Sequence, residues 1–226
     1  MRWQEPKQIP IPQELQKSMN LHPLVAQVLV KRGITTPQDA ASFLDPQTYK
    51  PTPASELPDL EVAADLIEEA VEKGQRILVW GDFDVDGQTA TTLLVEALRG
   101  LGASVDYHIP VRATESHGIT LPVLQAKIAD GFDLLLTCDT GITAHEAVEF
   151  ARTQGKTVII TDHHQLPDSL PGAHAVVNSQ RVPEGHPLHT LPGVGVAYKL
   201  VEEMYNRADR QDECEIFLDL VALGIV

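Results

Sequence analysis

Residues 77–87 read ILVWGDFDVDG, an apolar run that passes directly into three alternating aspartates and a glycine. The apolar part is rich in aliphatic and aromatic residues, which favours a short buried strand. The aspartates stand where that strand would end. Gly87 lets the backbone turn tightly into an amphipathic helix, which we expect over residues 89–101.

The same alternation of apolar run and amphipathic stretch continues along the chain from Arg76. We expect strands at residues 77–80, 105–109, 134–137, 158–161 and 175–177, and further helices at residues 122–130 and 144–155. Continuous apolar strands that alternate with helices are typical of a parallel sheet covered on both faces. The sequence therefore predicts an α/β fold with about five parallel strands and helices on both faces.

The first 75 residues show short helical stretches interrupted by prolines instead of alternating strands and helices. Pro23 and Pro37 stand at the first positions of two short helices, and Thr36 is the expected N-cap of the second. Residues 45–57 are rich in Pro, Thr and Ser and read as a linker. We predict an N-terminal helical region with its linker over residues 1–75, and the α/β domain over residues 76–226.

Three of the expected strands end in acidic or histidine residues. They are followed by Asp82, Asp84 and Asp86, by Asp139, and by Asp162, His163 and His164. In an open α/β sheet, ligands bind at the carboxyl ends of the strands. Since all three clusters lie at this end, we expect their side chains to converge.

The aspartate cluster of residues 82–86 favours a divalent cation, because carboxylates this close repel one another unless cations lie among them. Carboxylate oxygens suit Mg²⁺ or Mn²⁺, and an added imidazole favours Mn²⁺. An EF-hand calcium loop also begins with this pattern, but its twelfth position would be Leu93 instead of glutamate. Taken alone, the cluster could equally be a solvated acidic turn, and Asp139 a helix N-cap.

Composition gives a weaker guide to function. The net charge of −15 argues against a broad basic surface for nucleic acid, although acidic residues gathered around metals also lower net charge. Two cysteines are too few for a disulfide framework, and no apolar run has membrane-spanning length. We expect a cytoplasmic protein that does not enter the membrane.

The clusters, in their order and spacing, resemble the first three signature motifs of the DHH phosphoesterases. Residues 109–119 resemble the arginine segment of the RecJ branch, with Ser-His where that branch usually has Gly-Tyr. Residues 191–200 are similar to its glycine-rich helix start, and residues 218–224 to the run before its fourth motif. The resemblance implies a further metal-binding aspartate after the equivalent of Gly224, so we expect this domain to be truncated before it.

The resemblance implies a site with two ions, Mn²⁺ or Mg²⁺, that activate water for in-line attack on a phosphodiester. Asp82 and Asp84 would hold one ion, Asp139 would bridge both, and Asp86 and His163 would hold the other. The phosphate or DNA contacts that we expect come from one arginine, one histidine, two glycines and one lysine: Arg112, His164, Gly193, Gly195 and Lys199.

The leading hypothesis is a metal-dependent 5′-to-3′ exonuclease on single-stranded DNA that acts in repair and recombination. The resemblance also implies a RecQ-type helicase and a single-strand-binding protein as partners. A DHH phosphodiesterase of short oligonucleotides or cyclic dinucleotides is the enzymatic alternative. A catalytically inactive DHH scaffold, or an inert fragment, is the other alternative, although such scaffold relatives tend to lose the acidic ligands that this chain keeps.

Overall fold

The computed structural model describes residues 9–226, which form two compact units, one ending at Pro51 and the other running from Thr52 to Val226. The smaller unit contains three short α-helices and a 3₁₀ turn. They are α1 (Gln13–Ser18), α2 (Pro23–Lys31), α3 (Pro37–Leu44) and η1 (Pro46–Thr48). Leu15, Leu29 and Ala40 are buried between the helices. The expected cap is present, since the Thr36 hydroxyl accepts a hydrogen bond from the Asp39 amide at 3.1 Å.

The larger unit is built on a five-stranded parallel sheet with strand order β2-β1-β3-β4-β5. The strands are β1 (Arg76–Trp80), β2 (Ser104–His108), β3 (Leu134–Cys138), β4 (Thr157–Asp162) and β5 (Ala175–Asn178). The prediction of a parallel α/β sheet is thus confirmed. The order itself was not predictable, because strand order depends on which way each crossover turns.

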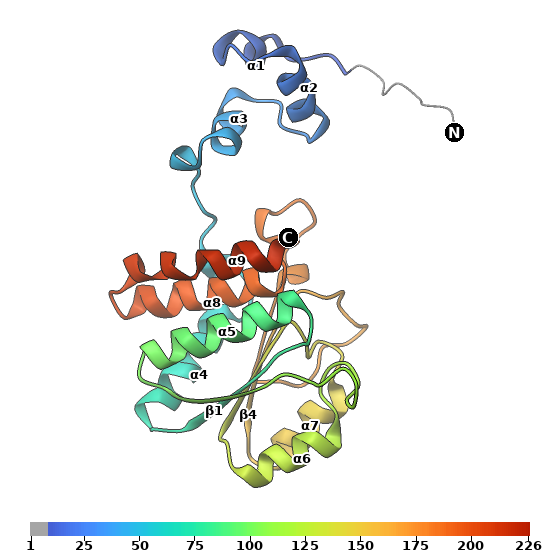
Figure 1. The fold of residues 1–226 in the computed structure, drawn as a ribbon, viewed down its shortest axis with the longest axis vertical. Coiled ribbons are helices and arrows are strands. Elements are labelled where there is room, and N and C mark those ends of the chain that lie inside the picture. The colour runs from blue at the N-terminus through green and yellow to red at the C-terminus, as the bar shows by residue number, and fades with distance from the viewer. Residues whose placement is uncertain (1–8) are drawn as a thin grey trace, which may run out of the picture. The chain divides into compact units, whose positions relative to one another are not determined.

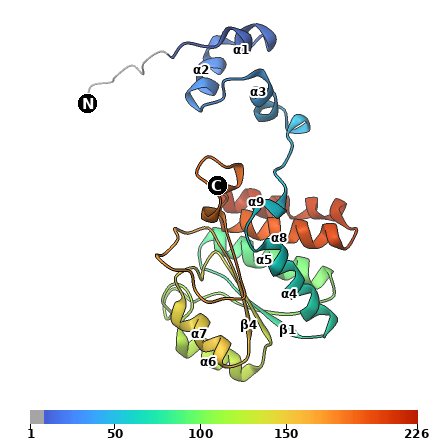
Figure 2. The same ribbon diagram turned by 180° about the vertical axis from the view of Figure 1, so that it is seen from behind.

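Helices cover both faces of the sheet (Figures 1 and 2). One face is packed by α4 (Leu60–Glu72), α5 (Val85–Gly100) and α8 (Gly193–Arg207), and α9 (Leu218–Ile225) packs on α5 and α8. The other is packed by α6 (Leu121–Asp130) and α7 (His145–Thr153). The remaining elements are the 3₁₀ turns η2 (Ala54–Glu56), η3 (Ser179–Arg181), η4 (Pro187–Thr190) and η5 (Gln211–Phe217).

Alternation along each strand explains why both faces are apolar. In β1, Ile77 and Val79 join the core under α4, α5 and α8, whereas Leu78 and Trp80 point to the core under α6 and α7. The central strands are therefore apolar at consecutive positions, as the sequence pattern indicated. None of the helices described between residues 9 and 226 is long and apolar enough to cross a membrane.

Two boundaries differ from those that the sequence suggested. Helix α5 begins at Val85, four residues before the expected start, because the Asp84 carboxylate caps it by accepting from the Gly87 amide at 3.0 Å. Helix α4 contacts β5 and α8, so the larger unit includes it and begins at Thr52. A functional division of the chain at residue 76 stays a prediction.

Candidate metal centre

The register of the sheet places three aspartates in one row. Trp80 lies opposite Thr137, and Cys138 lies opposite Thr161. Continued past the strand ends, this register sets Asp82 level with Asp139, and Asp139 level with Asp162. The chain passes from β1 outward to β2 and then back across β1 to β3, so the row crosses the topological switch point, where ligands bind in such sheets.

Asp139 is the residue around which the potential metal ligands gather. Donor atoms of Asp82, Asp84 and Asp139 lie within 4.8 Å of one another, and so do donor atoms of Asp139, His163 and His164. The His163 Nε2 lies 3.0 Å from the Asp139 Oδ1. Residues from three strand ends thus share one centre, as the sequence predicted for their location.

Asp86 reaches the same centre from the first turn of α5. Its Oδ2 lies 3.6 Å from the His163 Nε2. Its two oxygens also accept hydrogen bonds from the amides of Gly193 and Val194, at 2.8 and 2.7 Å. Asp86 therefore fixes the N-terminus of α8 beside the cluster, where the helix dipole also favours a carboxylate.

The surroundings of Asp139 favour a carboxylate that binds a cation over one that has no ligand. The residue is 2% exposed, and its Oδ1 faces the His163 Nε2 at 3.0 Å but accepts no hydrogen bond from a backbone amide among the described residues. Burial raises its pKa to about 6, although the neighbouring His163 opposes the shift. Its backbone has φ of +58°, a left-handed conformation that is uncommon outside glycine and is found at functional sites.

A hard divalent cation fits this donor set. It would bind the buried Oδ1 and would offset the repulsion among the carboxylates. Carboxylates together with one imidazole suit Mn²⁺, and carboxylates alone suit Mg²⁺. The aspartates and His163 of this chain therefore fit the ions that the sequence pattern indicated.

Asp162 has a different task, which is to hold the two histidines. Its Oδ1 accepts hydrogen bonds from the amides of His163 and His164 and from the His164 Nδ1, and its Oδ2 accepts from the Ile142 amide. Burial alone would raise the pKa of Asp162, but these hydrogen bonds together lower it. The same contact with Asp162 raises the pKa of His164 to about 9, so His164 is a cation at neutral pH.

We expect Asp162→Asn to lower the free energy of unfolding by about 2 kcal/mol in EDTA, because an amide cannot accept from both sides. The lowered pKa of Asp162 means that this stabilisation is present at neutral pH and is lost as the pH falls below about 4. Urea denaturation at pH 7 measures the change. Asp168→Asn, an exposed aspartate, is the control and should change little. Equal stability of Asp162→Asn and the unmodified protein would contradict this role.

The expected phosphate contacts divide into those near the centre and those engaged elsewhere. Arg112 lies over the Phe83 ring at 5.0 Å from its centroid, and His164 lines the cleft beside Asp139. Lys199 is only 7% exposed, and its ammonium donates to the Thr52 carbonyl and to Glu202. Its ammonium is thus engaged within the protein, and a DNA contact by Lys199 stays a prediction.

The glycines at the start of α8 also serve another purpose than the one predicted. The Gly193 amide donates a hydrogen bond to the Asp86 Oδ2 at 2.8 Å. A Cβ on Gly193 would lie 2.5 Å from the Asp139 Oδ1, so only glycine fits there. Gly195 packs closely on Leu191 and Pro192. The pair allows α8 to approach the candidate metal centre, and the phosphate contacts expected of Gly193 and Gly195 stay predictions.

A cleft of about 270 Å³ opens beside the centre and includes Asp82, Asp139, Asp162 and His164 in its lining. His117 also lines it, although its place in the arginine segment was the only sequence signal for that residue. Cys138 is no alternative nucleophile, because burial raises the pKa of its thiol to about 12.

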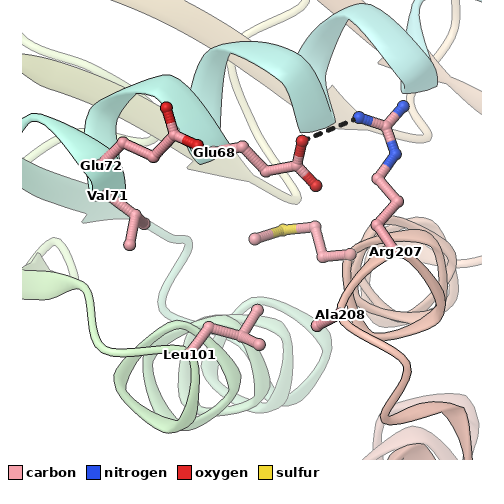
Figure 3. A pocket seen from close by; sticks show the side chains of 7 residues that line it. Glu68, Val71, Glu72, Leu101, Arg207 and Ala208 are labelled. Carbon is pink, nitrogen blue, oxygen red and sulfur yellow. Dashed lines mark hydrogen bonds and ion pairs between the residues drawn. The ribbon is translucent and has the colours of Figure 1, made fainter.

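A separate hollow of about 200 Å³ lies between α4, α8 and the end of α5 (Figure 3). Val71, Leu101 and Met204 line it, and Arg207 pairs with Glu68 at its edge. The segments that lead into β1 and β2 pass here, so this hollow lies at the amino ends of the strands. It is therefore not part of the candidate centre.

Comparison with known proteins agrees with this geometry. Residues 76–225 match the family described as "DHH family, N-terminal domain". The chain is 37% identical over 231 residues to the single-stranded-DNA-specific exonuclease RecJ of Bacillus subtilis. The alignment covers 100% of this chain and 28% of that protein.

Two solved structures are similar in fold as well as sequence. RecJ of Thermus thermophilus in complex with Mn²⁺ is 32% identical with a TM-score of 0.79, covering 96% of this chain and 31% of that one. The same protein in complex with Mg²⁺ is 30% identical with a TM-score of 0.65, covering 96% of this chain and 27% of that one. The chain thus spans less than a third of the length of these relatives. On the family match and the placement of its aspartate and histidine motifs, the chain belongs to the DHH family.

Proposed function

We propose that this chain is the metal-binding part of a nuclease that hydrolyses phosphodiester bonds in single-stranded DNA from the 5′ end. The observation that carries the proposal is the convergence of Asp82, Asp84, Asp86 and His163 on the buried Asp139, whose Oδ1 accepts no backbone hydrogen bond among the described residues. The similarity to RecJ exonucleases gives the substrate class and the ions, Mn²⁺ or Mg²⁺.

Five residues are the proposed metal ligands. Asp82 and Asp84 would hold one ion, Asp86 and His163 the other, and Asp139 both. When bound, such a pair supplies Lewis acidity, which makes water a better nucleophile and neutralises charge on the phosphate. Asp162 holds His164 protonated at the cleft, where it would donate to a phosphate oxygen. Arg112, which forms no ion pair among the described residues, would contact a further phosphate.

The position of Gly224 supports the fourth motif that the resemblance implies. A Cβ on Gly224 would lie 2.6 Å from the Thr89 Oγ1 and 2.7 Å from the Val194 Cγ1. The Val194 amide donates a hydrogen bond to Asp86. Since Gly224 lies against Val194, the end of α9 is close to the candidate metal centre. A ligand supplied by residues that follow Gly224 would therefore have a short path to it.

The proposal includes the cellular setting. Degradation of chromosomal DNA takes place in the cytoplasm of a bacterium, and the two free, buried cysteines suit a reducing compartment. A RecQ-type helicase would supply the single strand, and a single-strand-binding protein would coat it. These two partners rest on the family resemblance alone.

The test is digestion of a long strand labelled at its 5′ or 3′ end, compared with a dinucleotide, by the longest chain that the gene encodes. We expect release of 5′-terminal nucleotides with Mn²⁺ and none with EDTA. Hydrolysis of the dinucleotide alone would favour the oligonucleotide phosphodiesterase instead. No hydrolysis of either substrate with Mn²⁺ or Mg²⁺ would contradict the proposal and favour the scaffold.

A further inference from the structure

A stack of three side chains stands beside the metal centre. The rings of Phe83 and His117 lie with their centroids 4.6 Å apart and tilted by 48°, and the Arg112 guanidinium lies over the Phe83 ring. Phe83 is the residue between Asp82 and Asp84. The stack is therefore joined directly to two of the proposed metal ligands.

The base of this stack is held in place by the backbone. The Phe83 amide donates to the Asp82 Oδ1 at 2.7 Å, and the Phe83 carbonyl accepts from the Gln88 Nε2 at 2.6 Å. The loop that carries His117 is held by the His108 Nε2 and the Glu115 Oε2, which lie 2.8 Å apart. Both Phe83 and the loop before His117 are thus tied to neighbouring groups.

His117 offers an aromatic surface to the cleft. Its side chain is exposed, and it lines the same cleft as Asp82, Asp139 and His164. Among the described residues, the contact with Phe83 is the one interaction that His117 makes. Arg112, also exposed, adds a positive charge over the Phe83 ring.

We propose that His117 is a stacking platform for a nucleobase of the strand held in the cleft, with Arg112 as the contact for the adjoining phosphate. A flat ring with an exposed surface, next to a cation and a phosphate-cleaving centre, matches the parts of one nucleotide. Base stacking on aromatic side chains tolerates every base, which suits a substrate without sequence preference. This inference rests on the proposed function, since it places the nucleotide whose phosphate would be cleaved.

The experiment uses a single strand with 2-aminopurine at the 5′ end and phosphorothioate linkages that resist hydrolysis, in Mn²⁺. Stacking quenches 2-aminopurine fluorescence, so the signal reports the platform without turnover. We expect quenching with the unmodified protein and with His117→Phe and His117→Tyr. We expect His117→Leu and His117→Ala to lose the quenching and to bind about tenfold more weakly.

The controls separate stacking from charge and from folding. His145→Leu changes an exposed histidine on α7 and should quench as the unmodified protein does. Arg112→Gln should weaken binding and lower its salt dependence while the bound strand stays quenched. Mn²⁺ affinity, measured by calorimetry, should be the same in all of these variants.

The platform is overturned if His117→Leu quenches fully, if His117→Phe fails to restore quenching, or if the unmodified protein gives none. Failure of the proposed function would give a different result, namely no Mn²⁺-dependent hydrolysis of an ordinary strand. Quenching without hydrolysis would retain the platform and reject the nuclease.

Discussion

Replacing Asp139 with asparagine is expected to abolish Mn²⁺ binding and to make the metal-free protein more stable. Both results follow from one feature, a buried carboxylate whose Oδ1 accepts no backbone hydrogen bond among the described residues and which lies beside three other aspartates. Asp139 is the proposed ligand of both ions, so its loss would remove a ligand from each ion position. Hydrolysis should fall by about 10³-fold or more.

The gain in stability follows from the pKa of Asp139, which burial raises from 3.8 to about 6. A raised carboxyl pKa means that the folded state favours the protonated form, so ionisation lowers the stability as the pH rises from about 4 to 6. Asparagine removes this cost, and it accepts the left-handed backbone as aspartate does. At pH 7 we expect the free energy of unfolding to rise by about 2 kcal/mol.

Urea denaturation in EDTA at pH 4 and pH 7 measures this effect, with calorimetry for Mn²⁺. The difference between Asp139→Asn and the unmodified protein should be small at pH 4 and larger at pH 7. Asp162→Asn is the matched comparison, because it makes the same change one strand away and should destabilise. A destabilised Asp139→Asn that still binds two Mn²⁺ ions would contradict this account of the site.

Gly193→Ala is expected to lower Mn²⁺ affinity by about 100-fold although residue 193 carries no ligand. The added Cβ would lie 2.5 Å from the Asp139 Oδ1 and 2.6 Å from the Asp139 Cβ. Either Asp139 moves or α8 withdraws. Withdrawal would also break the hydrogen bonds from Gly193 and Val194 to Asp86. The cost in stability should be about 2 kcal/mol, as for overpacking elsewhere.

The control for this change is Gly172→Ala, where the new Cβ meets only the end of the Arg152 side chain, at 3.0 Å. Arg152 is flexible and exposed enough to move, so stability and Mn²⁺ affinity should be unchanged. Calorimetric titration with Mn²⁺ and urea denaturation measure both variants. Normal Mn²⁺ affinity in a folded Gly193→Ala protein would show that α8 does not buttress the centre.

The sheet could be predicted because its strands are apolar on both faces. Runs such as residues 134–137 need burial at every position, and this requirement by itself implies a parallel sheet between two helical layers. The ends of the helices were harder to predict. Helix α5 starts before its apolar stripe does, because the Asp84 side chain caps it. From the sequence alone, Asp84 could be either a helix cap or a metal ligand.

The candidate centre was predictable only in outline. Strand ends place Asp82, Asp139 and Asp162 in one row, so their convergence follows from the fold. Which of them faces a cation does not, because Asp139 and Asp162 look alike in sequence and differ only in hydrogen-bond partners. Lys199 shows the same limit, since the sequence does not reveal that its ammonium lies buried against the Thr52 carbonyl and Glu202.

Anomalous diffraction from crystals soaked in Mn²⁺ would examine the paired-ion centre directly. We expect two peaks, one bounded by Asp82, Asp84 and Asp139 and the other by Asp86, Asp139 and His163. Crystals that take up Mn²⁺ only outside this cleft, or that show no peak in contact with Asp139, would contradict the assignment of the metal centre.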